Sequence, residues 1–144
     1  MNALLKKERA VLMADDDEDD RVLTRNAFKR GELNEGLHFA ANGEELMQKL
    51  RAEGQRPDLI LLDLNMPRMN GMEALKEIKA DPSLRDIPVV VLTTSTDPED
   101  LHRSYRLGAN SYITKPNNVE GYQHMVQSLS RYWFDTVTLP HEHP

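Results

Sequence analysis

Acidic side chains follow short apolar runs at two places in the chain. Asp63 comes directly after Leu59–Leu62, and Asp15 and Asp16 come directly after Val11–Ala14. A short, uninterrupted apolar run bounded by polar residues is typical of a buried parallel strand. The carboxyl ends of parallel strands meet at one edge of the sheet, where open α/β sheets place their ligand sites. We therefore expect these three carboxylates to lie in one cleft.

Two further apolar runs end in a hydroxyl and in an ammonium group. Val89–Leu92 leads into Thr93, and Tyr112–Thr114 leads into Lys115 and Pro116. Alone, such a Thr is usually only a strand residue and such a Lys is usually solvated. Here both follow strand ends that match those of the acids, and a cis bond before the proline is one way to fix the lysine's direction. The same sheet edge is expected to gather all of these groups.

The gathered carboxylates predict a magnesium site beside a phosphoryl acceptor. Carboxylates in one cleft repel one another, so some take up protons unless a cation neutralises them. Mg²⁺ is a hard ion that binds carboxylates, carbonyls, waters and phosphate oxygens. Asp63 could then attack a phosphoryl group and form an aspartyl-phosphate. Mg²⁺ and Lys115 would neutralise the phosphoryl oxygens, while the Thr93 hydroxyl would donate a hydrogen bond to one of them.

The acidic run Asp15–Asp20 could also be interpreted as a calcium-binding loop or as a solvated loop. Acids at its first, third and fifth positions are typical of an EF-hand loop, but that loop requires Gly at the sixth position and Glu at the twelfth. The chain has Asp20 and Asn26 at those positions. We reject the calcium loop and interpret Asp17–Asp20 as a solvated loop.

Helical patterns alternate with the strand-like runs. The clearest helix begins at Asp97, a good N-cap followed by Pro98, and stops at Gly108. Leu37–Ala40 is a less apolar strand, which we expect at a sheet edge. This alternation predicts an α/β domain with a parallel sheet and helices on both faces. The other helices are marked by apolar residues at helical spacing: Val22, Leu23, Ala27 and Phe28; Leu46, Met47 and Leu50; Met72, Leu75 and Ile78; and Tyr122, Met125, Val126, Leu129 and Trp133.

Length and composition narrow the class of protein. A chain of 144 residues fits one domain. The formal net charge of -6 argues against a nucleic-acid binder, and the sequence has no stretch of membrane-spanning length. There are no cysteines for disulfides or thiolate metal sites, and the first ten residues lack the apolar core of a signal peptide. We expect a cytoplasmic protein that binds neither nucleic acid nor membrane.

These features together resemble the receiver domain of two-component response regulators, of the chemotaxis-regulator type, over about residues 9–131. The resemblance is carried by the stretches VLMADDD, DLILLDLNMPRMNG, VVVLTTS and GANSYITKP. It implies a doubly wound, flavodoxin-like, five-stranded parallel sheet of strand order 2-1-3-4-5.

The resemblance also implies a role for each residue of the site. The phosphoacceptor would be Asp63, and the aromatic switch residue would be Tyr112. In the family, the switch threonine and the aromatic residue move inward when the acceptor is phosphorylated. The metal ligands would be Asp15, Asp16, Asp63 and the backbone carbonyl of Asn65, and the switch hydroxyl and pocket lysine would be Thr93 and Lys115.

By this resemblance the chain is a stand-alone phosphorylated switch and not an enzyme with a free substrate. A sensor histidine kinase would phosphorylate Asp63, and the surface of the fourth helix, fifth strand and fifth helix would then signal by protein binding. One alternative is a receiver-shaped scaffold that dimerises without phosphorylation. Another is an aspartyl phosphatase of the haloacid-dehalogenase type. Such enzymes usually use a second Asp as general acid at the position where this chain has Asn65.

The tail after the fifth helix carries three consecutive aromatic residues, Tyr132–Phe134. They cannot all face inward from adjacent helix positions, and an exposed apolar cluster usually marks an interface. Residues 132–144 resemble the tail of single-domain regulators of bacterial phytochrome kinases. We therefore treat 1–144 as a single receiver domain, expect a two-fold homodimer through the fifth helix and the tail, and name a phytochrome as the expected kinase.

Overall fold

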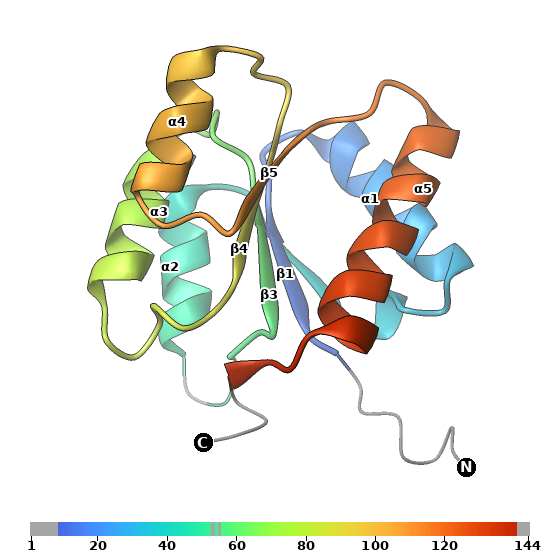
Figure 1. Ribbon diagram of the computed structural model, residues 1–144, viewed down its shortest axis with the longest axis horizontal. Helices are drawn as coiled ribbons and strands as arrows, with labels where there is room; N and C mark the ends of the chain where they lie inside the picture. The colour runs from blue at the N-terminus through green and yellow to red at the C-terminus, as the bar shows by residue number, and fades with distance from the viewer. Residues whose placement is uncertain (1–8, 53, 55, 141–144) are drawn as a thin grey trace.

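The chain folds into a parallel sheet between two layers of helices (Figure 1). The computed structural model describes residues 9–52, 54 and 56–140. The five strands lie in the order β2-β1-β3-β4-β5, which confirms the predicted fold class and places β2 at an edge. The strands are β1 (Val11–Ala14), β2 (Leu37–Ala40), β3 (Leu59–Leu62), β4 (Val89–Thr93) and β5 (Ser111–Thr114).

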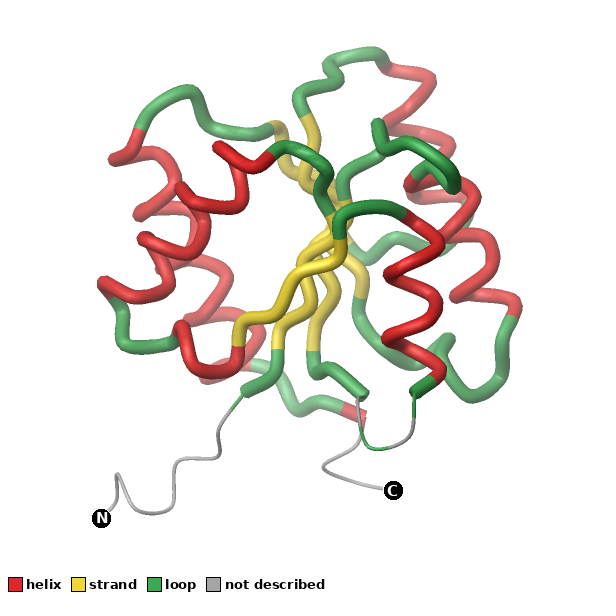
Figure 2. Tube along the Cα trace, turned by 180° about the vertical axis from the view of Figure 1, so that it is seen from behind, coloured by secondary structure: helices red, strands yellow, loops and turns green. Residues whose placement is uncertain are grey.

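The helices divide between the two faces of the sheet. Helices α1 and α5 cover one face, and α2, α3 and α4 cover the other, with the strands visible between the layers from behind (Figures 1 and 2). Of the part of the chain that is described, no helix is both long and apolar enough to cross a bilayer. The helices are α1 (Glu18–Arg30), α2 (Gly43–Arg51), α3 (Gly71–Ala80), α4 (Pro98–Arg106) and α5 (Val119–Ser130), with a short 3-10 turn at Asn34–Gly36.

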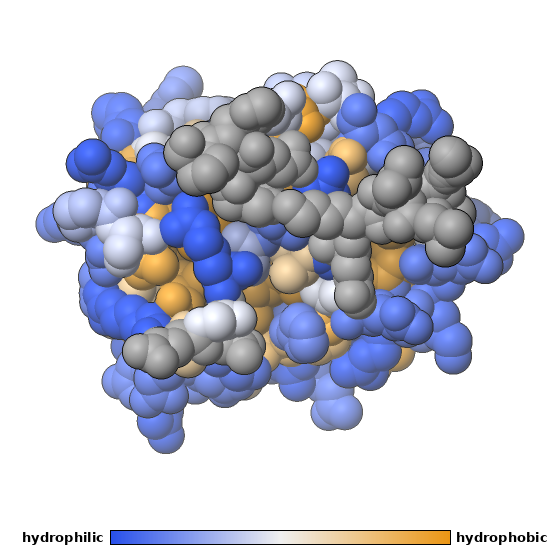
Figure 3. All heavy atoms as spheres, turned by 90° about the horizontal axis from the view of Figure 1, so that it is seen from below, coloured by the Kyte–Doolittle hydropathy of each residue, from blue (hydrophilic) through white to orange (hydrophobic). Residues whose placement is uncertain are grey.

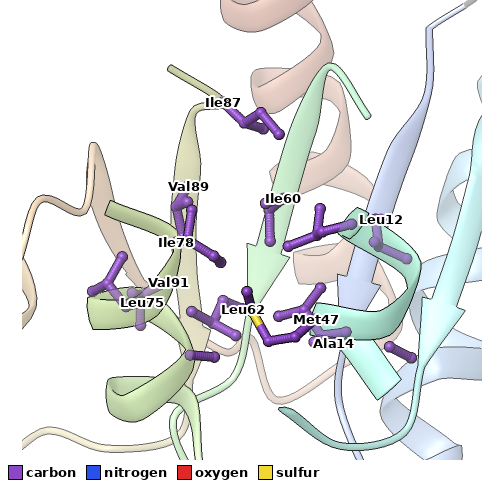
Figure 4. Close-up of a cluster of buried hydrophobic side chains, with 14 of the residues drawn as sticks. Leu12, Ala14, Met47, Ile60, Leu62, Leu75, Ile78, Ile87, Val89 and Val91 are labelled. Atoms are coloured by element: carbon purple, nitrogen blue, oxygen red, sulfur yellow. The ribbon is translucent and has the colours of Figure 1, made fainter. Parts of the chain in front are cut away.

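The buried strands supply apolar side chains to both faces, because successive residues of a strand point in opposite directions. In Figure 4 the side chains of Leu12, Ile60 and Val91 lie on the face covered by α2 and α3, beside Met47 and Ile78. The alternate strand residues pack with α1 and α5 on the other face. Burial on both sides explains why the sequences of these strands are continuous apolar runs.

All five main helices begin with an Asp or Asn side chain that accepts a hydrogen bond from the first helical turn. Asp97 and Pro98 start α4 as predicted, and Asn70 and Glu73 form a reciprocal capping box at α3. Because each helix follows a strand, these helix starts lie at the carboxyl edge of the sheet. The five capping residues are Asp17, Asn42, Asn70, Asp97 and Asn118.

The end of α5 corrects one part of the sequence analysis. We expected Trp133 to continue the buried face of the helix, four residues after Leu129. Instead the helix widens into a π-helical turn over Arg131–Thr136, which has more residues per turn. Phe134, five residues after Leu129, is therefore the buried aromatic, and Trp133 is only partly buried.

The opposite end of the sheet is closed in part by the chain after this turn. Leu139 is buried, and the Arg9 side chain donates a hydrogen bond to the Phe134 carbonyl at 3.3 Å. Seen from below, apolar side chains show in the middle of this face inside a hydrophilic rim (Figure 3). Part of the predicted tail is thus core, while residues 141–144 lie outside the described residues.

The burial of Phe134 predicts that the tail contributes to the stability of the domain. Phe134→Ala should lower the free energy of unfolding by about 3 kcal/mol, because it removes a buried ring and leaves a cavity. Tyr132→Ala is the matched control: this residue is 53% exposed, so a change of about 0.5 kcal/mol or less is expected. Urea denaturation at low protein concentration measures both. Equal small effects would mean that the tail does not pack on the core.

Candidate phosphoacceptor and cation site

Asp63 is fixed where β3 leaves the sheet. Its backbone N–H donates to the Ala14 carbonyl at 3.0 Å, which ties the end of β3 to the end of β1. The carboxylate is almost fully buried, and its Oδ1 accepts a hydrogen bond of 3.3 Å from the Asn65 N–H. A Cβ on Gly71 would lie 2.2 Å from the Asp63 carbonyl, so only glycine lets α3 begin this close.

Asp15 and Asp16 lie at the end of the neighbouring strand, as predicted. Asp15 is completely buried, and its Oδ1 accepts a hydrogen bond of 2.9 Å from the Asp17 N–H. Asp16 is exposed. Among the described residues, Asp15, Asp16 and Asp63 each place a carboxylate oxygen within 4.8 Å of the others. The structure thus brings the three predicted acids together.

Lys115 reaches into the same site from the loop after β5. Its Nζ lies 2.8 Å from Asp15 Oδ2, 2.6 Å from Asp20 Oδ2 and 3.0 Å from Asp63 Oδ2, and its side chain is only 4% exposed. Its backbone N–H donates to the Thr93 carbonyl at 2.7 Å, which fixes where the side chain starts. The ammonium is thereby placed in the middle of the acids.

The bond between Lys115 and Pro116 is trans. The cis form considered in the sequence analysis is therefore not what directs the lysine. The three carboxylates and the backbone hydrogen bond account for its direction instead.

The sequence analysis expected a solvated loop over Asp17–Asp20. Residues 17–19 are exposed as expected, but the loop assignment was wrong, and so was the interpretation of Asp20 as merely solvated. Asp17 is the N-cap of α1, and Asp20 lies in its first turn, where the carboxylate contacts Lys115. The buried Tyr122 of α5 donates a long hydrogen bond of 3.4 Å to Asp20 Oδ1. The position of the N-cap could have revealed this. If Asp17 caps the helix, Asp20 lies three positions later, in the first turn and over the sheet edge.

The electrostatics of the site follow from burying several acids around one base. Burial raises the pKa of Asp15 from 3.8 to about 6, and the contacts with Lys115 and the Asp17 N–H only partly oppose it. Burial by itself would lower the pKa of Lys115, but its close contacts with three carboxylates outweigh this effect and raise that pKa. Burial likewise raises the pKa of Tyr122 to about 12. The site retains excess negative charge.

The residues present fit a divalent cation. Asp15 Oδ2 is fully buried and takes part in no hydrogen bond of normal geometry, although the charge of Lys115 lies close to it. Carboxylate oxygens are ligands that hard divalent ions prefer. A cation among Asp15, Asp16 and Asp63 would neutralise the charge that Lys115 leaves uncompensated.

Thr93 and Tyr112 lie beside this site on neighbouring strands. Thr93 is completely buried, and its Oγ1 accepts a hydrogen bond of 3.4 Å from the Ser95 N–H. The partly buried ring of Tyr112 packs against the core under α2 and α3, and its hydroxyl donates to the Ser95 carbonyl at 3.0 Å. Both residues therefore contact the same segment of the loop after β4.

Comparison with known proteins places the chain in a family. The model of the response regulator receiver domain matches residues 11–127. The chain belongs to this family. Receiver domains are signalling proteins that histidine kinases phosphorylate, and they bind divalent metal ions. This identity favours a signalling protein over the phosphatase that the sequence analysis considered.

The relatives of this receiver domain include phytochrome response regulators. It is 40% identical to the response regulator Rcp1 of Synechocystis over 92% of this chain and 93% of that relative. A crystal structure of the phosphorylated cyanobacterial phytochrome response regulator RcpA has a TM-score of 0.88 and 39% identity, covering 93% of this chain and 99% of that one. A Mn²⁺-bound form of Rcp1 has a TM-score of 0.82 and 40% identity, with coverages of 92% and 99%.

The raised pKa of Asp15 predicts opposite effects of Asp15→Asn on stability and on cation binding. A carboxyl whose folded pKa is above its unfolded value contributes stability that is present below pH 4 and is lost as the pH rises through 6. At pH 7 the metal-free variant should therefore be more stable than wild type by about 1 to 3 kcal/mol. The difference should shrink as the pH falls toward 4.

The same variant should lose its response to magnesium. The wild-type midpoint of thermal unfolding should rise with MgCl₂, because a ligand that binds only the folded state stabilises it, and that of Asp15→Asn should not. Asp16→Asn is the control: it removes an exposed acid of the same cluster, so it should weaken the magnesium response without the large gain in stability. A less stable Asp15→Asn variant at pH 7 would contradict this account.

Proposed function

We propose that this receiver domain accepts a phosphoryl group on Asp63 from a sensor histidine kinase, in a Mg²⁺-dependent reaction, and then signals by binding another protein. The observation that carries the proposal is the convergence of Asp15, Asp16, Asp63 and Lys115 at one sheet edge. A carboxylate flanked by a cation site and a buried ammonium is suited to attack phosphorus, because phosphoryl transfer depends on positioning and charge neutralisation.

In the proposed reaction an Asp63 oxygen attacks the phosphorus of a phosphohistidine. The new O–P bond forms as the N–P bond breaks, and the histidine nitrogen leaves and regains a proton. Lys115 and the Thr93 hydroxyl would contact the phosphoryl oxygens. A Mg²⁺ ion held by Asp15, Asp16, Asp63 and the Asn65 carbonyl would neutralise the charge of the carboxylates and of the phosphoryl group.

Thr93 and Tyr112 are proposed to carry the change outward. Both contact Ser95, whose Oγ also donates to Asp100 in the first turn of α4 at 2.6 Å. A new contact between Thr93 and the phosphoryl group would bias this segment toward one of two arrangements. The surface of α4, β5 and α5 is therefore the proposed signalling surface.

The proposed kinase is a phytochrome, and residues 1–144 are proposed to form a single receiver domain. Support comes from the phytochrome response regulator RcpA, of which the chain covers 99%. The cytoplasmic location expected from the sequence stays a prediction.

Intact mass spectrometry tests the acceptor. After incubation with acetyl phosphate and Mg²⁺, wild type should gain one phosphoryl group, and chelation of the metal should abolish the gain. Asp63→Asn should gain none, because an amide oxygen is a poor nucleophile toward phosphorus. Asp86→Asn, which changes an exposed acid elsewhere, should behave as wild type.

The phosphorylation experiment also addresses the scaffold alternative. If folded wild type with Mg²⁺ gained no phosphoryl group from acetyl phosphate or from a phosphorylated phytochrome kinase, the protein would act as a scaffold that needs no phosphorylation.

We also propose that the receiver forms a two-fold homodimer through α5 and the tail. Support comes from an apolar groove of about 620 Å³ between β5, α5 and the tail, lined in part by Ile113, Met125 and Leu129. Tyr132 and Trp133 border it, with their rings edge to face at 5.0 Å. Aromatic residues that border an apolar groove are typical of interfaces.

Light scattering over a range of protein concentrations tests the dimer. Wild type should change from monomer to dimer as its concentration rises, and Tyr132→Asp should shift this change to higher concentration by about tenfold or more. Tyr105→Asp, on α4 and with a similar exposure of 48%, should have little effect. A strict monomer at high concentration, both with and without phosphorylation, would refute the dimer.

A further inference from the structure

Asp20 makes a contact in the site that the proposed function leaves without a role. Its Oδ2 lies 2.6 Å from Lys115 Nζ, closer than the oxygens of Asp15 at 2.8 Å and Asp63 at 3.0 Å. An ammonium group has three N–H donors. Two of these donors make hydrogen bonds to Asp20 and Asp63, while Asp15 contributes an ion pair. Asp20 holds the shortest of the three contacts.

Asp20 differs from the other two partners of Lys115 in what else it can do. Asp15 and Asp63 belong to the carboxylate group that could hold a cation, and Asp20 does not. Under the proposed function, Asp63 also becomes the phosphorylated residue. Asp20 is thus the one carboxylate of the three that has no second task during the reaction.

The carboxylate of Asp20 is itself held in place. It lies in the first turn of α1, where the backbone N–H of Asp20 donates to Asp17 Oδ1 at 3.1 Å. The Asp20 carbonyl accepts a hydrogen bond of 2.8 Å from the Thr24 hydroxyl. The hydroxyl of the buried Tyr122 lies 3.4 Å from Asp20 Oδ1 and approaches from α5. Backbone and side chain are both constrained, so the position of the carboxylate is well defined.

We propose that Asp20 is a positioning residue that holds the ammonium of Lys115 over the acceptor while Asp63 takes up the phosphoryl group. The inference rests on the proposed phosphorylation of Asp63 and adds a residue to that site. Without Asp20, the two remaining partners of Lys115 are both committed to the cation and the phosphoryl group. Lys115 would then be placed less accurately, and misplacement of a charged group slows phosphoryl transfer.

Rates of phosphorylation by acetyl phosphate test this role. Asp20→Asn keeps the shape of the side chain and removes its charge, and should slow phosphorylation of Asp63 by about tenfold. Asp19→Asn is the matched control: it removes the same charge from the same helical turn, but from an exposed position. Its rate should stay within about twofold of wild type.

A double variant separates action through Lys115 from a general effect of charge or folding. In a Lys115→Ala background, Asp20→Asn should change the rate by less than about twofold, because the residue it positions is gone. A full tenfold effect in that background would overturn the proposed role.

A second readout needs neither metal nor phosphodonor. In the metal-free protein, the ¹⁵N-labelled ammonium of Lys115 should give a signal protected from solvent exchange, assigned by its absence in Lys115→Arg. Asp20→Asn should lose or broaden this signal, and Asp19→Asn should keep it. An unchanged signal in Asp20→Asn would show that Asp20 does not hold the lysine.

The outcomes distinguish the inference from the function on which it rests. If wild type is phosphorylated and Asp20→Asn reacts as fast as Asp19→Asn, the inference alone fails. If wild type takes no phosphoryl group from any donor, the proposed function fails and the inference fails with it.

Discussion

The buried ammonium of Lys115 is the constraint on which the rest of the site depends. Taking such a charge out of water is costly unless each donor finds a partner. Its partners come from three places in the chain: Asp15 after β1, Asp63 after β3 and Asp20 in α1. One ion-pair cluster thus connects the centre of the sheet, a helix on one face and the loop after the edge strand β5.

The fold meets this constraint with ordinary backbone interactions. A parallel sheet brings the ends of β1 and β3 together, and the hydrogen bond from the Asp63 N–H to the Ala14 carbonyl fixes their offset. The hydrogen bond from the Lys115 N–H to the Thr93 carbonyl does the same across β4 and β5. Asp17 caps α1 so that its first turn faces the lysine. Each charged group therefore starts from a fixed backbone position, which limits the entropy lost when the cluster forms.

The sequence was sufficient for the sheet and for the acids at its edge, and it was insufficient where helix geometry decides. Strand ends in a parallel sheet share an edge, so Asp15, Asp16 and Asp63 could be placed together from the apolar runs alone. Asp20 was assigned to a loop because a run of acidic residues is usually solvated. Which of these acids turns inward depends on where α1 begins, and it begins at Glu18. After Ser130 the helix changes to a π-helical turn, so Phe134 is buried in place of Trp133. The regular spacing of apolar residues in an α-helix could not predict this change.

The same cluster explains why the site is suited to switching. Around Lys115 there are more carboxylates than one ammonium can neutralise. Burial raises the pKa of Asp15, and Asp15 Oδ2 has no hydrogen bond. A ligand that supplies positive charge and binds only the folded state therefore stabilises a folded state with such excess negative charge. Thr93 and Tyr112 both contact Ser95, which is also bonded to Asp100 of α4. A rearrangement of charge at Asp63 that moves Thr93 would therefore act on the loop that joins the site to α4, through a single contiguous set of hydrogen bonds.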